Sequence, residues 1–300
     1  MRVVISGASG LIGTALSESL RADGHEVIAL VRREARTQQE SAWSPSTHHV
    51  DEGVIASADA VVNLAGASIG ARRLTRAYKR EVLASRVDAT TTLATAIAAA
   101  DSPARLIQAS SMGYYGARGD DELTEQSQPG SGFLAEVCQA WEAASEPASR
   151  AGSQVIFART GLVLAGHGGF AERLVPLARR GLIGGFGNGR AFQSWITLHD
   201  HIRAMRLLLT ADIEGPVNVI APEAARDGDL VRSLSAAFGR RPGLRVPRWA
   251  LHLVIGEAAN DLLASQRGIP TVLTAAGFAW DHATLASACA YVAGADAAAA

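Results

Sequence analysis

The stretch that decides the fold is Gly7-Ala8-Ser9-Gly10-Leu11-Ile12-Gly13. A short apolar strand is predicted directly before it, over residues 2–5, and a helix begins within it. Apolar side chains recur every four residues along that helix until Gly24, where it ends, and a second apolar strand follows over 25–31. The pattern predicts a βαβ unit whose first turn is rich in glycine.

A glycine-rich turn that opens a helix is a binding site for the pyrophosphate of a dinucleotide. The glycines permit a tight turn, leave room for a phosphate and allow close contact between helix and strand. The helix N-terminus adds backbone N–H groups that attract the anion. The residues expected to contact the cofactor here are Gly7, Ser9, Gly10, Leu11, Ile12 and Gly13.

The end of the second strand indicates which dinucleotide is bound. In NAD-specific folds an acidic residue about 20 residues beyond the glycines binds the ribose 2′-hydroxyl. Here Arg32 and Arg33 hold that place, and Glu34 stands one position too late. Because a guanidinium group binds phosphate through charge-assisted, bidentate hydrogen bonds, the sequence favours NADP(H). The alternative is a pair of solvated arginines in a loop.

Length and composition bound the class of protein. The 300 residues, 48% of them hydrophobic, can bury a large core, formed by one Rossmann domain and a smaller lobe. The net charge of −1 argues against nonspecific binding to nucleic acid or to anionic membranes. The arginine pairs at 72–73, 179–180 and 240–241 are interpreted as solvated surface.

The sequence favours a cytoplasmic protein. Its two cysteines, Cys138 and Cys289, imply no disulfide framework. The first predicted strand begins at residue 2, which leaves no room for a signal peptide. No apolar run resembles a membrane span, and the alanine-rich end after Tyr291 is predicted to be a frayed tail.

Strands and helices alternate along the chain. The further predicted elements are strands over 60–66, 105–110 and 154–159 and helices over 75–100 and 132–150. This alternation predicts an α/β fold: a Rossmann doubly wound parallel sheet with a smaller C-terminal α/β lobe. We expect the NADP-binding domain at 1–162, with a strand near 216–220 returning to it, and the substrate-side lobe at 163–300. The segment 37–52 is expected to be irregular.

Three predicted strands carry small or polar residues at their carboxyl ends, the edge where open α/β sheets bind ligands. The small residues at 63–66 let adenosine and ribose lie close to the backbone, so Gly66 joins the expected cofactor contacts. Hydroxyl groups within 110–116 can polarise a carbonyl or relay a proton near a nicotinamide. Arg159 ends the third strand and is also expected to contact the cofactor.

These motifs, in this order, resemble the extended short-chain dehydrogenase/reductases of the epimerase/dehydratase type. The GxxGxxG spacing is typical of their Rossmann domains, and the resemblance extends over nearly the whole chain. More narrowly, the chain is similar to atypical, uncharacterised members with a C-terminal domain of unknown function. The residues that carry the resemblance are Asn63-Leu64-Ala65-Gly66, Glu81, Ser85-Arg86, Gly113-Tyr114-Tyr115-Gly116, Cys138, Trp141-Glu142, Arg159-Thr160-Gly161-Leu162-Val163-Leu164, Gly168-Gly169, Ser194-Trp195-Ile196, Asp200, Gly215-Pro216-Val217-Asn218, Pro270 and Ala276-Gly277-Phe278.

The resemblance implies a cofactor, NADP(H), and an epimerase- or oxidoreductase-type activity. It also implies which residues contact NADP, namely Val31, Arg32, Leu64, Ala65, Glu81 and Arg86. Thr197 and His199 stand where the related pattern favours His and Asp, which leaves the chemistry beside Asp200 open.

The usual catalytic pair of this superfamily, Tyr-x-x-x-Lys, is absent from the chain. In typical members the tyrosine exchanges a proton with the substrate and the lysine lowers the pKa of that tyrosine. By position, Cys138 and Glu142 occupy the two places, and a carboxylate does not supply the missing cation. The candidate replacements are Ser110, Ser111, Tyr114, Tyr115, Cys138 and Glu142. The alternative is that Cys138 is a small buried residue and Glu142 a local cap or bridge.

Tyr114 and Tyr115 are the best candidates for a proton donor. Adjacent residues of an extended chain point to opposite sides, so only one of them is expected to face a pocket. Without a nearby lysine its pKa is expected to stay close to about 10, which favours carbonyl reduction over alcohol oxidation.

Several other clusters are interpreted structurally. The histidines at 48–49 and 199–201 lack further ligands at zinc-like spacing, so no metal site is predicted. The glycine-rich loop at 184–189 either closes over a ligand or forms a surface turn. The run 249–263 predicts an amphipathic helix, for which core packing is favoured over a partner surface.

Two classes of function remain. One is an NADP(H)-dependent, epimerase/dehydratase-like oxidoreductase acting on an unknown small carbonyl or sugar-like substrate. The other is a non-catalytic protein that binds NADP(H) and reports the redox state to a partner. The missing Tyr-x-x-x-Lys favours the second class, and the hydroxyl-rich strand end favours the first, which we prefer. No nucleic-acid or membrane partner is expected, and the sequence does not indicate an oligomeric state.

Overall fold

The computed structural model describes residues 1–168 and 171–299, with the side chains of 171, 173 and 295–299 left out. Gly169, part of the Gly168-Gly169 match, therefore lies outside the described residues. The chain forms two compact units, each assembled from three segments. The first unit comprises Met1–Ser110, Glu136–Ala158 and Ile202–Pro216, and the second comprises Ser111–Ala135, Arg159–His201 and the chain from Val217 onward. The predicted domain boundary at residue 162 stays a prediction.

A seven-stranded sheet forms the framework, with the strand order β12-β7-β5-β4-β1-β2-β3. Its strands, in chain order, are β1 (Arg2–Ser6), β2 (Glu26–Val31), β3 (Glu40–Ala42), β4 (Ala60–Asn63), β5 (Arg105–Ser111), β7 (Val155–Thr160) and β12 (Gly215–Val219). β1 pairs in parallel with β2 and with β4, and β4 pairs in parallel with β5. The strand order therefore reverses beside β1, as in a doubly wound sheet. The predicted α/β Rossmann fold is confirmed.

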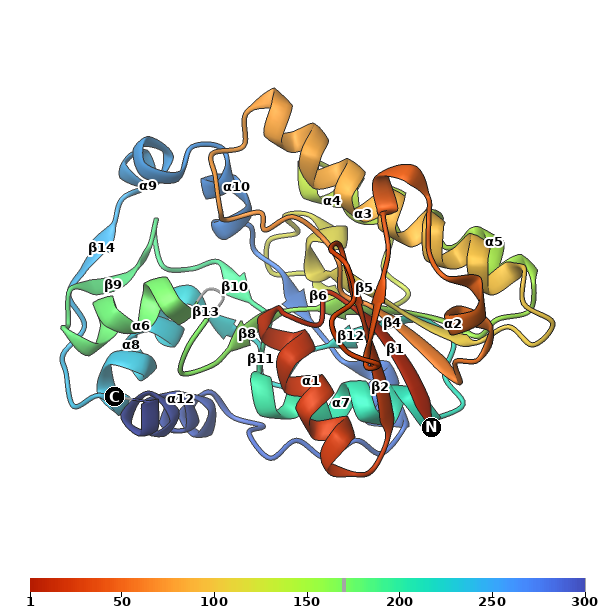
Figure 1. Cartoon of the computed structure of the whole chain (residues 1–300). Coiled ribbons are helices and arrows are strands. Elements are labelled where there is room, and N and C mark those ends of the chain that lie inside the picture. Colours follow the sequence, from red (N-terminus) through yellow and green to blue (C-terminus); the bar gives the residue numbers. More distant parts are fainter. Residues whose placement is uncertain (169–170, 300) are drawn as a thin grey trace. The chain divides into compact units, whose positions relative to one another are not determined.

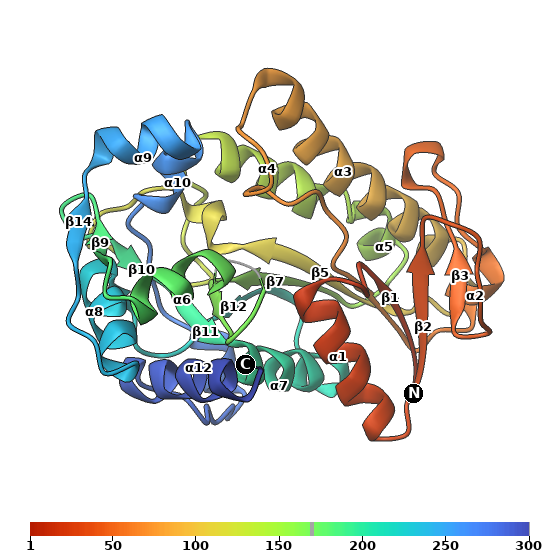
Figure 2. The same ribbon diagram turned by 60° about the vertical axis from the view of Figure 1, so that its left-hand side comes forward.

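Helices lie on both faces of this sheet, as Figures 1 and 2 show. One face carries α3 (Arg76–Ala98), α4 (Phe133–Ala143) and α5 (Glu146–Arg150), and the other carries α1 (Leu11–Ala22) and α7 (Leu198–Thr210). The short helix α2 (Glu52–Ala56) precedes β4. In the core of the first unit, Leu93 and Ile97 of α3 are fully buried together with Val4, Val61 and Leu106 of the strands. Each such side chain contributes about 1.5–3 kcal/mol by leaving water.

The boundaries of α3 follow from local chemistry. Thr75 caps the helix, since its hydroxyl group accepts a hydrogen bond from the backbone N–H of Tyr78. Val82, Ala89 and Leu93 recur at helical spacing and are fully buried. This confirms the helix that the sequence predicts over 75–100.

The second unit consists of short strands and helices around its own core. Its strands are β6 (Glu122–Leu123), β8 (Leu162–Leu164), β9 (Ile183–Phe186), β10 (Phe192–Gln193), β11 (Trp195–Thr197), β13 (Ala225–Arg226), β14 (Leu244–Val246) and β15 (Arg267–Gly268). Its helices are η2 (Met112–Tyr115), α6 (Ala171–Arg179), α8 (Asp227–Ala237), α9 (Arg248–Ile255), α10 (Ala258–Leu262), α11 (Thr271–Ala275) and α12 (Leu285–Ala299). Trp195 is fully buried in the core of this unit, with Leu164, Leu230, Leu234 and Cys289.

Two predicted segments are more regular than the sequence indicates. The segment 37–52 contains β3 and a short 3₁₀ helix, η1 (Pro45–Thr47), because β3 pairs in parallel with the edge of β2. The alanine-rich end, predicted to fray, continues as α12 to Ala299. Alanine has the highest intrinsic helix propensity, which explains the continuation.

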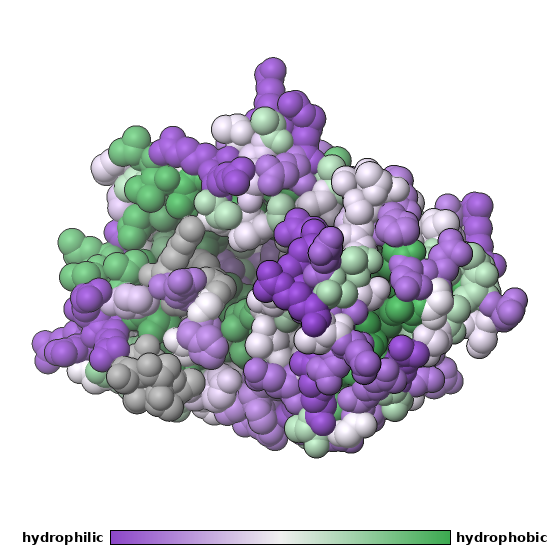
Figure 3. Space-filling view, in the orientation of Figure 1, coloured by the Kyte–Doolittle hydropathy of each residue, from purple (hydrophilic) through white to green (hydrophobic). Residues whose placement is uncertain are grey.

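Two predicted helices are broken. The helix over 132–150 stops after Ala143 and restarts as α5, where Pro147 occupies the first turn. The run 249–263 forms α9 and α10, which are separated by Gly256 with a φ of +63°. Core packing is wrong for most of α9, because Trp249, Leu253 and Val254 are exposed and Leu251 is buried. Figure 3 shows hydrophobic surface at the upper left, where α9 lies.

No helix within residues 1–168 and 171–299 combines the length and apolarity needed to cross a membrane.

Candidate functional site

The first unit contains a cleft of about 1040 Å³ beside the ends of β1, β2 and β4. Its wall is formed by residues 7–10 after β1, 31–33 at the end of β2 and 64–67 after β4. Glu81 and Ser85 of α3 line it as well. The cleft therefore lies where the strand order reverses, which is the ligand-binding position of this fold.

Backbone atoms shape the glycine-rich end of the cleft. Gly7 has a φ of +69°, and a Cβ there would lie 2.7 Å from the Leu64 carbonyl oxygen. A Cβ on Gly13 would lie 2.3 Å from the Gly7 carbonyl oxygen. Gly10 caps α1 without a side-chain hydrogen bond, so the first backbone N–H groups of the helix are available to an anion. This cradle fits a dinucleotide pyrophosphate.

The two arginines after β2 have different surroundings. Arg33 forms a bidentate ion pair with Glu40, with N–O distances of 2.9 and 2.6 Å. The hydrogen bond from Arg33 lowers the pKa of Glu40 to about 2, with help from the Arg36 backbone N–H. Arg32 lines the cleft and is exposed. Of the two, Arg32 is therefore the guanidinium group suited to a ribose 2′-phosphate.

A buried polar network fixes the end of β4. The Asn63 side chain donates to Thr90 Oγ1 at 3.0 Å and to Gln108 Oε1 at 2.9 Å. Its carbonyl oxygen accepts from Ser6 Oγ at 2.5 Å and from the Ala65 backbone N–H at 3.2 Å. Every hydrogen-bonding position of the Asn63 amide is therefore used, which holds the turn into the cleft wall. This role of Asn63 was not predicted from the sequence, in which an Asn at the end of a buried apolar strand is the available signal.

Arg86 stabilises the same wall from behind. Its side chain is buried, and its Nη1 donates to the carbonyl oxygens of Ala67 and Val82 at 3.0 and 3.1 Å. The guanidinium carbon lies 4.9 Å from the Trp141 ring centroid and packs against Gly66. Burial lowers the pKa of Arg86 from its usual value. Arg86 is thus a positioning residue for the loop at 64–67.

The residues that the sequence predicts to contact the cofactor, apart from Arg86, lie in three places. Those that line the cleft are Gly7, Ser9, Gly10, Val31, Arg32, Leu64, Ala65, Gly66 and Glu81. Leu11, Ile12 and Gly13 form the first turn of α1. Arg159 belongs to the second unit. Contact between these residues and a cofactor stays a prediction.

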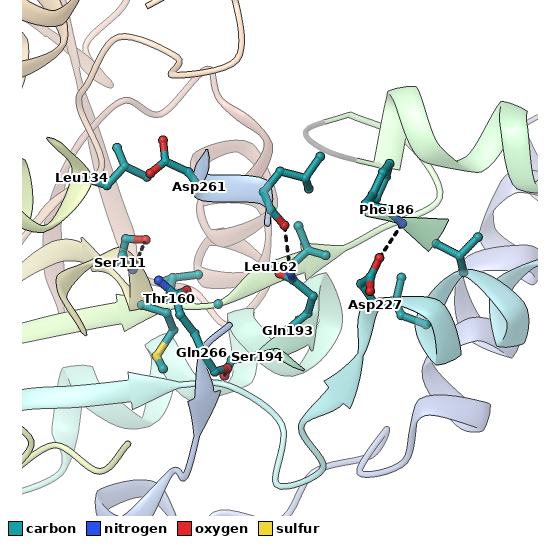
Figure 4. A pocket seen from close by; sticks show the side chains of 16 residues that line it. Ser111, Leu134, Thr160, Leu162, Phe186, Gln193, Ser194, Asp227, Asp261 and Gln266 are labelled. Carbon is teal, nitrogen blue, oxygen red and sulfur yellow. Dashed lines mark hydrogen bonds between the residues drawn. The ribbon is translucent and has the colours of Figure 1, made fainter. Parts of the chain in front are cut away.

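The second unit contains a pocket of about 230 Å³, drawn in Figure 4. Its wall combines apolar side chains with hydroxyl, amide and carboxyl groups. This mixture is typical of a small-molecule site, in which a few polar groups orient a largely apolar ligand. The lining residues labelled in Figure 4 are Ser111, Leu134, Thr160, Leu162, Phe186, Gln193, Ser194, Asp227, Asp261 and Gln266.

Ser111 is the predicted catalytic residue that the structure places in this pocket. Its Oγ accepts the backbone N–H of Gly113 at 3.0 Å, which caps the 3₁₀ helix η2. Ser110, the preceding residue, belongs to the first unit, where its Oγ donates to Glu142 at 2.6 Å. Cys138 also lies in the first unit and is buried. Ser110, Cys138 and Glu142 stay untested as catalytic residues.

Tyr114 and Tyr115 lie on η2 and not on an extended chain, so the expected alternation of sides is wrong. Tyr115 is fully buried, and its hydroxyl group donates to Asn218 at 2.8 Å and accepts from Arg159 at 2.9 Å. Burial raises the pKa of Tyr115 to about 12, above the expected value. Arg159 also packs 3.5 Å from the Tyr114 ring centroid. Tyr115 thus joins η2 to β12, and its proposed proton transfer stays untested.

Asp227 is a buried carboxyl group in the pocket wall. Its Oδ2 accepts the backbone N–H of Phe186 at 2.6 Å, and its Oδ1 has no hydrogen-bond partner within the described chain. Burial raises the pKa of Asp227, against the effects of the backbone N–H groups of Phe186 and Gly228 and of the Arg245 charge. A carboxyl group kept towards its neutral form can donate a hydrogen bond to a ligand.

His201 is a second buried titratable group of this unit. Its Nε2 lies 3.1 Å from the hydroxyl oxygen of Thr160, which lines the pocket. Burial lowers the pKa of His201 to about 4, so the ring is neutral at physiological pH.

The polar cluster at the start of α7 is explained by hydrogen bonds. Thr197 Oγ1 accepts the backbone N–H of Asp200 at 3.1 Å. The buried Asp200 carboxylate accepts the backbone N–H groups of Asp281 and His282 at 2.9 and 2.8 Å. Ligand atoms of His199, Asp200 and Asp281 lie within 4.8 Å of one another. Because Asp200 is already engaged in orienting the loop at 281–282, we assign no metal to this cluster.

The fold and the cleft define a Rossmann-type dinucleotide-binding protein. The chain belongs to the NAD dependent epimerase/dehydratase family, whose model matches residues 3–221. A separate model, a domain of unknown function named DUF1731, matches residues 246–292. The resemblance inferred from the sequence motifs is therefore confirmed, including its C-terminal part.

Relatives match the chain over nearly its whole length. Epimerase family protein Mb2239 of Mycobacterium bovis is 40% identical over 291 residues, which is 96% of each chain. The crystal structure of human epimerase family protein SDR39U1 (isoform 2) with NADPH is similar with a TM-score of 0.88 and 30% identity, covering 98% of this chain and 99% of that one. The nucleoside-diphosphate sugar epimerase from Corynebacterium glutamicum has a TM-score of 0.81 and 35% identity, covering 98% of this chain and 58% of that one.

Proposed function

We propose that the protein is an NADP(H)-dependent oxidoreductase, or an epimerase that uses the same redox chemistry, acting on a small carbonyl or sugar-like substrate. The proposal rests on two features that occur together in this chain. One is a glycine cradle with an exposed arginine for a 2′-phosphate, and the other is a small pocket containing a serine hydroxyl at a strand end.

The preference for NADP(H) is supported by Arg32. The neighbouring Arg33 is neutralised by Glu40, and Arg32 lines the cleft at the position that an acidic residue holds in NAD-specific folds. The human relative that was crystallised with NADPH supports the same cofactor. When bound, NADPH supplies a hydride to an electrophilic carbon.

The chemistry proposed for this chain is proton transfer at the substrate oxygen. A carbonyl carbon that receives a hydride leaves its oxygen in need of a proton, and a hydroxyl group within reach supplies it. Ser111 is the candidate, because it lines the pocket with its oxygen held by the Gly113 backbone N–H. Apolar residues such as Leu134 and Leu162 exclude water around the reacting group. The pocket volume of about 230 Å³ favours a small substrate.

The experiment is a screen of aldehydes, ketones and keto sugars with NADPH deuterated at C4. Appearance of deuterium in a product, detected by mass spectrometry, shows hydride transfer. On any substrate found, Ser111→Ala is expected to lower kcat by about a hundredfold or more, since a proton donor contributes that much. Ser102→Ala, at an exposed position, is the matched control and is expected to leave the rate unchanged.

A non-catalytic NADP(H)-binding sensor is the second candidate. It is favoured by the absence of Tyr-x-x-x-Lys and by the burial of the Tyr115 hydroxyl group between Asn218 and Arg159. Tight NADPH binding without turnover on any carbonyl compound of the screen would support this candidate against the enzyme. We further propose a reducing, cytoplasmic compartment, since both cysteines are buried and neither forms a disulfide.

A further inference from the structure

The second unit contains a strongly basic segment of sequence. Between Arg232 and Glu257 the sequence contains four arginines and no acidic residue. These arginines are Arg240, Arg241, Arg245 and Arg248, and all four are exposed. In the part of the chain that the structure describes, none of the four forms an ion pair. Arg245 donates to the carbonyl oxygen of Asn188 at 3.0 Å, and its charge acts on the Asp227 carboxyl group. The whole-chain charge of −1 therefore does not describe this surface.

The same stretch exposes large apolar side chains. Exposed fractions are 86% for Leu244, 71% for Trp249, 68% for Leu253 and 69% for Val254. Leu182, 60% exposed, precedes β9, whose Ile183 pairs with Leu244 of β14. We name these five residues the α9 surface. Of the three other exposed large apolar residues of the described chain, Met1 and Leu83 belong to the first unit and Leu177 lies on α6.

The local structure brings these side chains to one surface. β14 leads through Pro247 directly into α9, so Leu244 and Trp249 are close along the chain. Trp249 and Leu253 are four residues apart on α9 and share one side of the helix. Leu251, on another side of the helix, is buried and attaches α9 to the unit. Figure 3 shows the result as hydrophobic areas at the upper left and left edge of the view, with hydrophilic residues beside them.

We propose that the α9 surface docks the protein onto a membrane that contains anionic lipids. Trp and Leu side chains bury favourably at the boundary between headgroups and acyl chains, and a rim of arginines is attracted to lipid phosphates. Because α9 has only eight residues, it lies on the membrane and does not cross it. Exposed fractions of 60–86% mean that the side chains protrude, as insertion between headgroups requires.

Two other occupants fit the surface less well. In a two-fold dimer the same patch meets its own copy, which brings the four arginines of one chain against those of the other. A protein partner needs a matching hollow for every protruding side chain, whereas a fluid lipid surface adapts to them. Charge and shape therefore favour the lipid surface.

Tryptophan fluorescence tests the proposal directly. Of the five tryptophans, Trp43, Trp141 and Trp195 are buried and Trp280 is partly buried, so Trp249 is the one that reports on this surface. Titration with phosphatidylcholine vesicles containing phosphatidylglycerol is expected to shift the emission to shorter wavelength. Phosphatidylcholine vesicles alone and high salt are expected to give little or no shift, since screening weakens the attraction. Trp249→Phe is expected to abolish the shift.

Variants separate the two contributions in a vesicle sedimentation assay. Arg240→Glu with Arg241→Glu is expected to weaken binding by at least about tenfold. Arg76→Glu with Arg80→Glu makes the same change of net charge on exposed positions of α3 and is expected to leave binding unchanged. Trp249→Ser with Leu253→Ser removes the apolar part and is expected to abolish binding, with folding checked by circular dichroism.

Three outcomes would overturn the proposal. They are absence of binding to anionic vesicles, equal binding to both kinds of vesicle, and equal losses for the Arg240/Arg241 variant and the Arg76/Arg80 variant. Sedimentation velocity adds a further check. A dimer that Trp249→Ser dissolves, without vesicle binding by the native chain, would assign the surface to a second copy instead.

Discussion

The cleft of the first unit and the pocket of the second are built from different chemical groups. The cleft is shaped by glycine backbone, by small residues and by the neutral network around Asn63. The pocket is lined by Asp227 and by Thr160, whose hydroxyl group contacts the buried His201. The first arrangement requires the absence of side chains, and the second requires buried titratable groups. We therefore expect steric changes to affect the cleft most and pH to affect the second unit most.

Gly13→Ala is expected to give the largest effect. The new Cβ would lie 2.3 Å from the Gly7 carbonyl oxygen and 2.7 Å from Ala8 Cα, so the glycine loop must move. We expect NADPH affinity to fall by more than about a hundredfold and the free energy of unfolding by about 1–3 kcal/mol. Calorimetric titration and thermal melting measure the two effects. Gly53→Ala is the matched control, since its Cβ approaches only the Asp51 side chain, at 3.3 Å.

The pH dependence of stability is expected to come from His201. Its pKa of about 4 in the folded chain lies below the usual 6.5, so folding favours the neutral ring. The contribution of His201 to the free energy of unfolding is fully present above pH 6.5 and is lost as the pH falls through about 4. Over that window the free energy of unfolding is expected to fall by about 3 kcal/mol. Urea unfolding at several pH values measures it. His201→Gln is expected to make the free energy of unfolding less dependent on pH below 6.5. The substitution His167→Gln, at an exposed position, is expected to leave that dependence unchanged. The same dependence in the native chain and both variants would contradict the prediction.

Arg32→Asp is expected to change cofactor choice. The substitution removes a charge-assisted hydrogen bond to the 2′-phosphate and places a carboxylate, which repels it, in the same position. We therefore expect NADPH affinity to fall by about tenfold to a hundredfold. NADH affinity is expected to be spared. Arg33→Ala is the control, because Arg33 is engaged with Glu40. Equal losses for both cofactors in calorimetry would argue against the assignment of Arg32.

Tyr115→Phe is expected to have a smaller effect on stability. It removes the hydrogen bonds of the hydroxyl group with Asn218 and Arg159 and costs about 1–3 kcal/mol, because these groups are buried. Tyr114→Phe keeps the ring under Arg159 and serves as the matched control. A fall in turnover in Tyr115→Phe without loss of stability would instead support Tyr115 as a proton donor.

Asp227→Asn is expected to have the smallest effect on stability and to reveal its pH dependence. Since burial raises the folded pKa of Asp227, its contribution is present below the usual 3.8 and is lost as pH rises through the folded pKa. As the pH rises, the Asp227→Asn variant is expected to lose less stability than the native chain, because its amide group does not ionise. Its Oδ1 can still accept the hydrogen bond from the Phe186 N–H. Identical pH profiles in thermal melting would show that Asp227 ionises freely.

The sequence was sufficient for the cleft because its determinants are local. The glycines at 7, 10 and 13 and the strand and helix around them are specified within about 30 residues, as a βαβ unit requires. The exposed arginine after β2 follows from the same spacing. The charge pattern after β2 did not distinguish Arg32 from Arg33, and only the family resemblance selected Arg32. The partner that neutralises Arg33 lies on β3, a strand formed only by pairing with β2.

The pocket and the surface depended on contacts between distant segments. The hydroxyl group of Tyr115 is held by Asn218 and Arg159, and the pKa of Asp227 is raised by its burial against the opposing effect of the Phe186 N–H of β9. The sequence did not predict the exposure of Trp249, because its amphipathic pattern is also typical of a helix packed against a core.

By itself, then, the sequence determined the family, the doubly wound fold and the cofactor cleft, since glycine spacing and apolar periodicity act through neighbouring residues. Only the tertiary structure decided which hydroxyl group faces the pocket, which buried groups change their pKa and which side of α9 faces solvent. The physical reason is that burial and desolvation depend on residues far apart in the chain, and no local pattern specifies them.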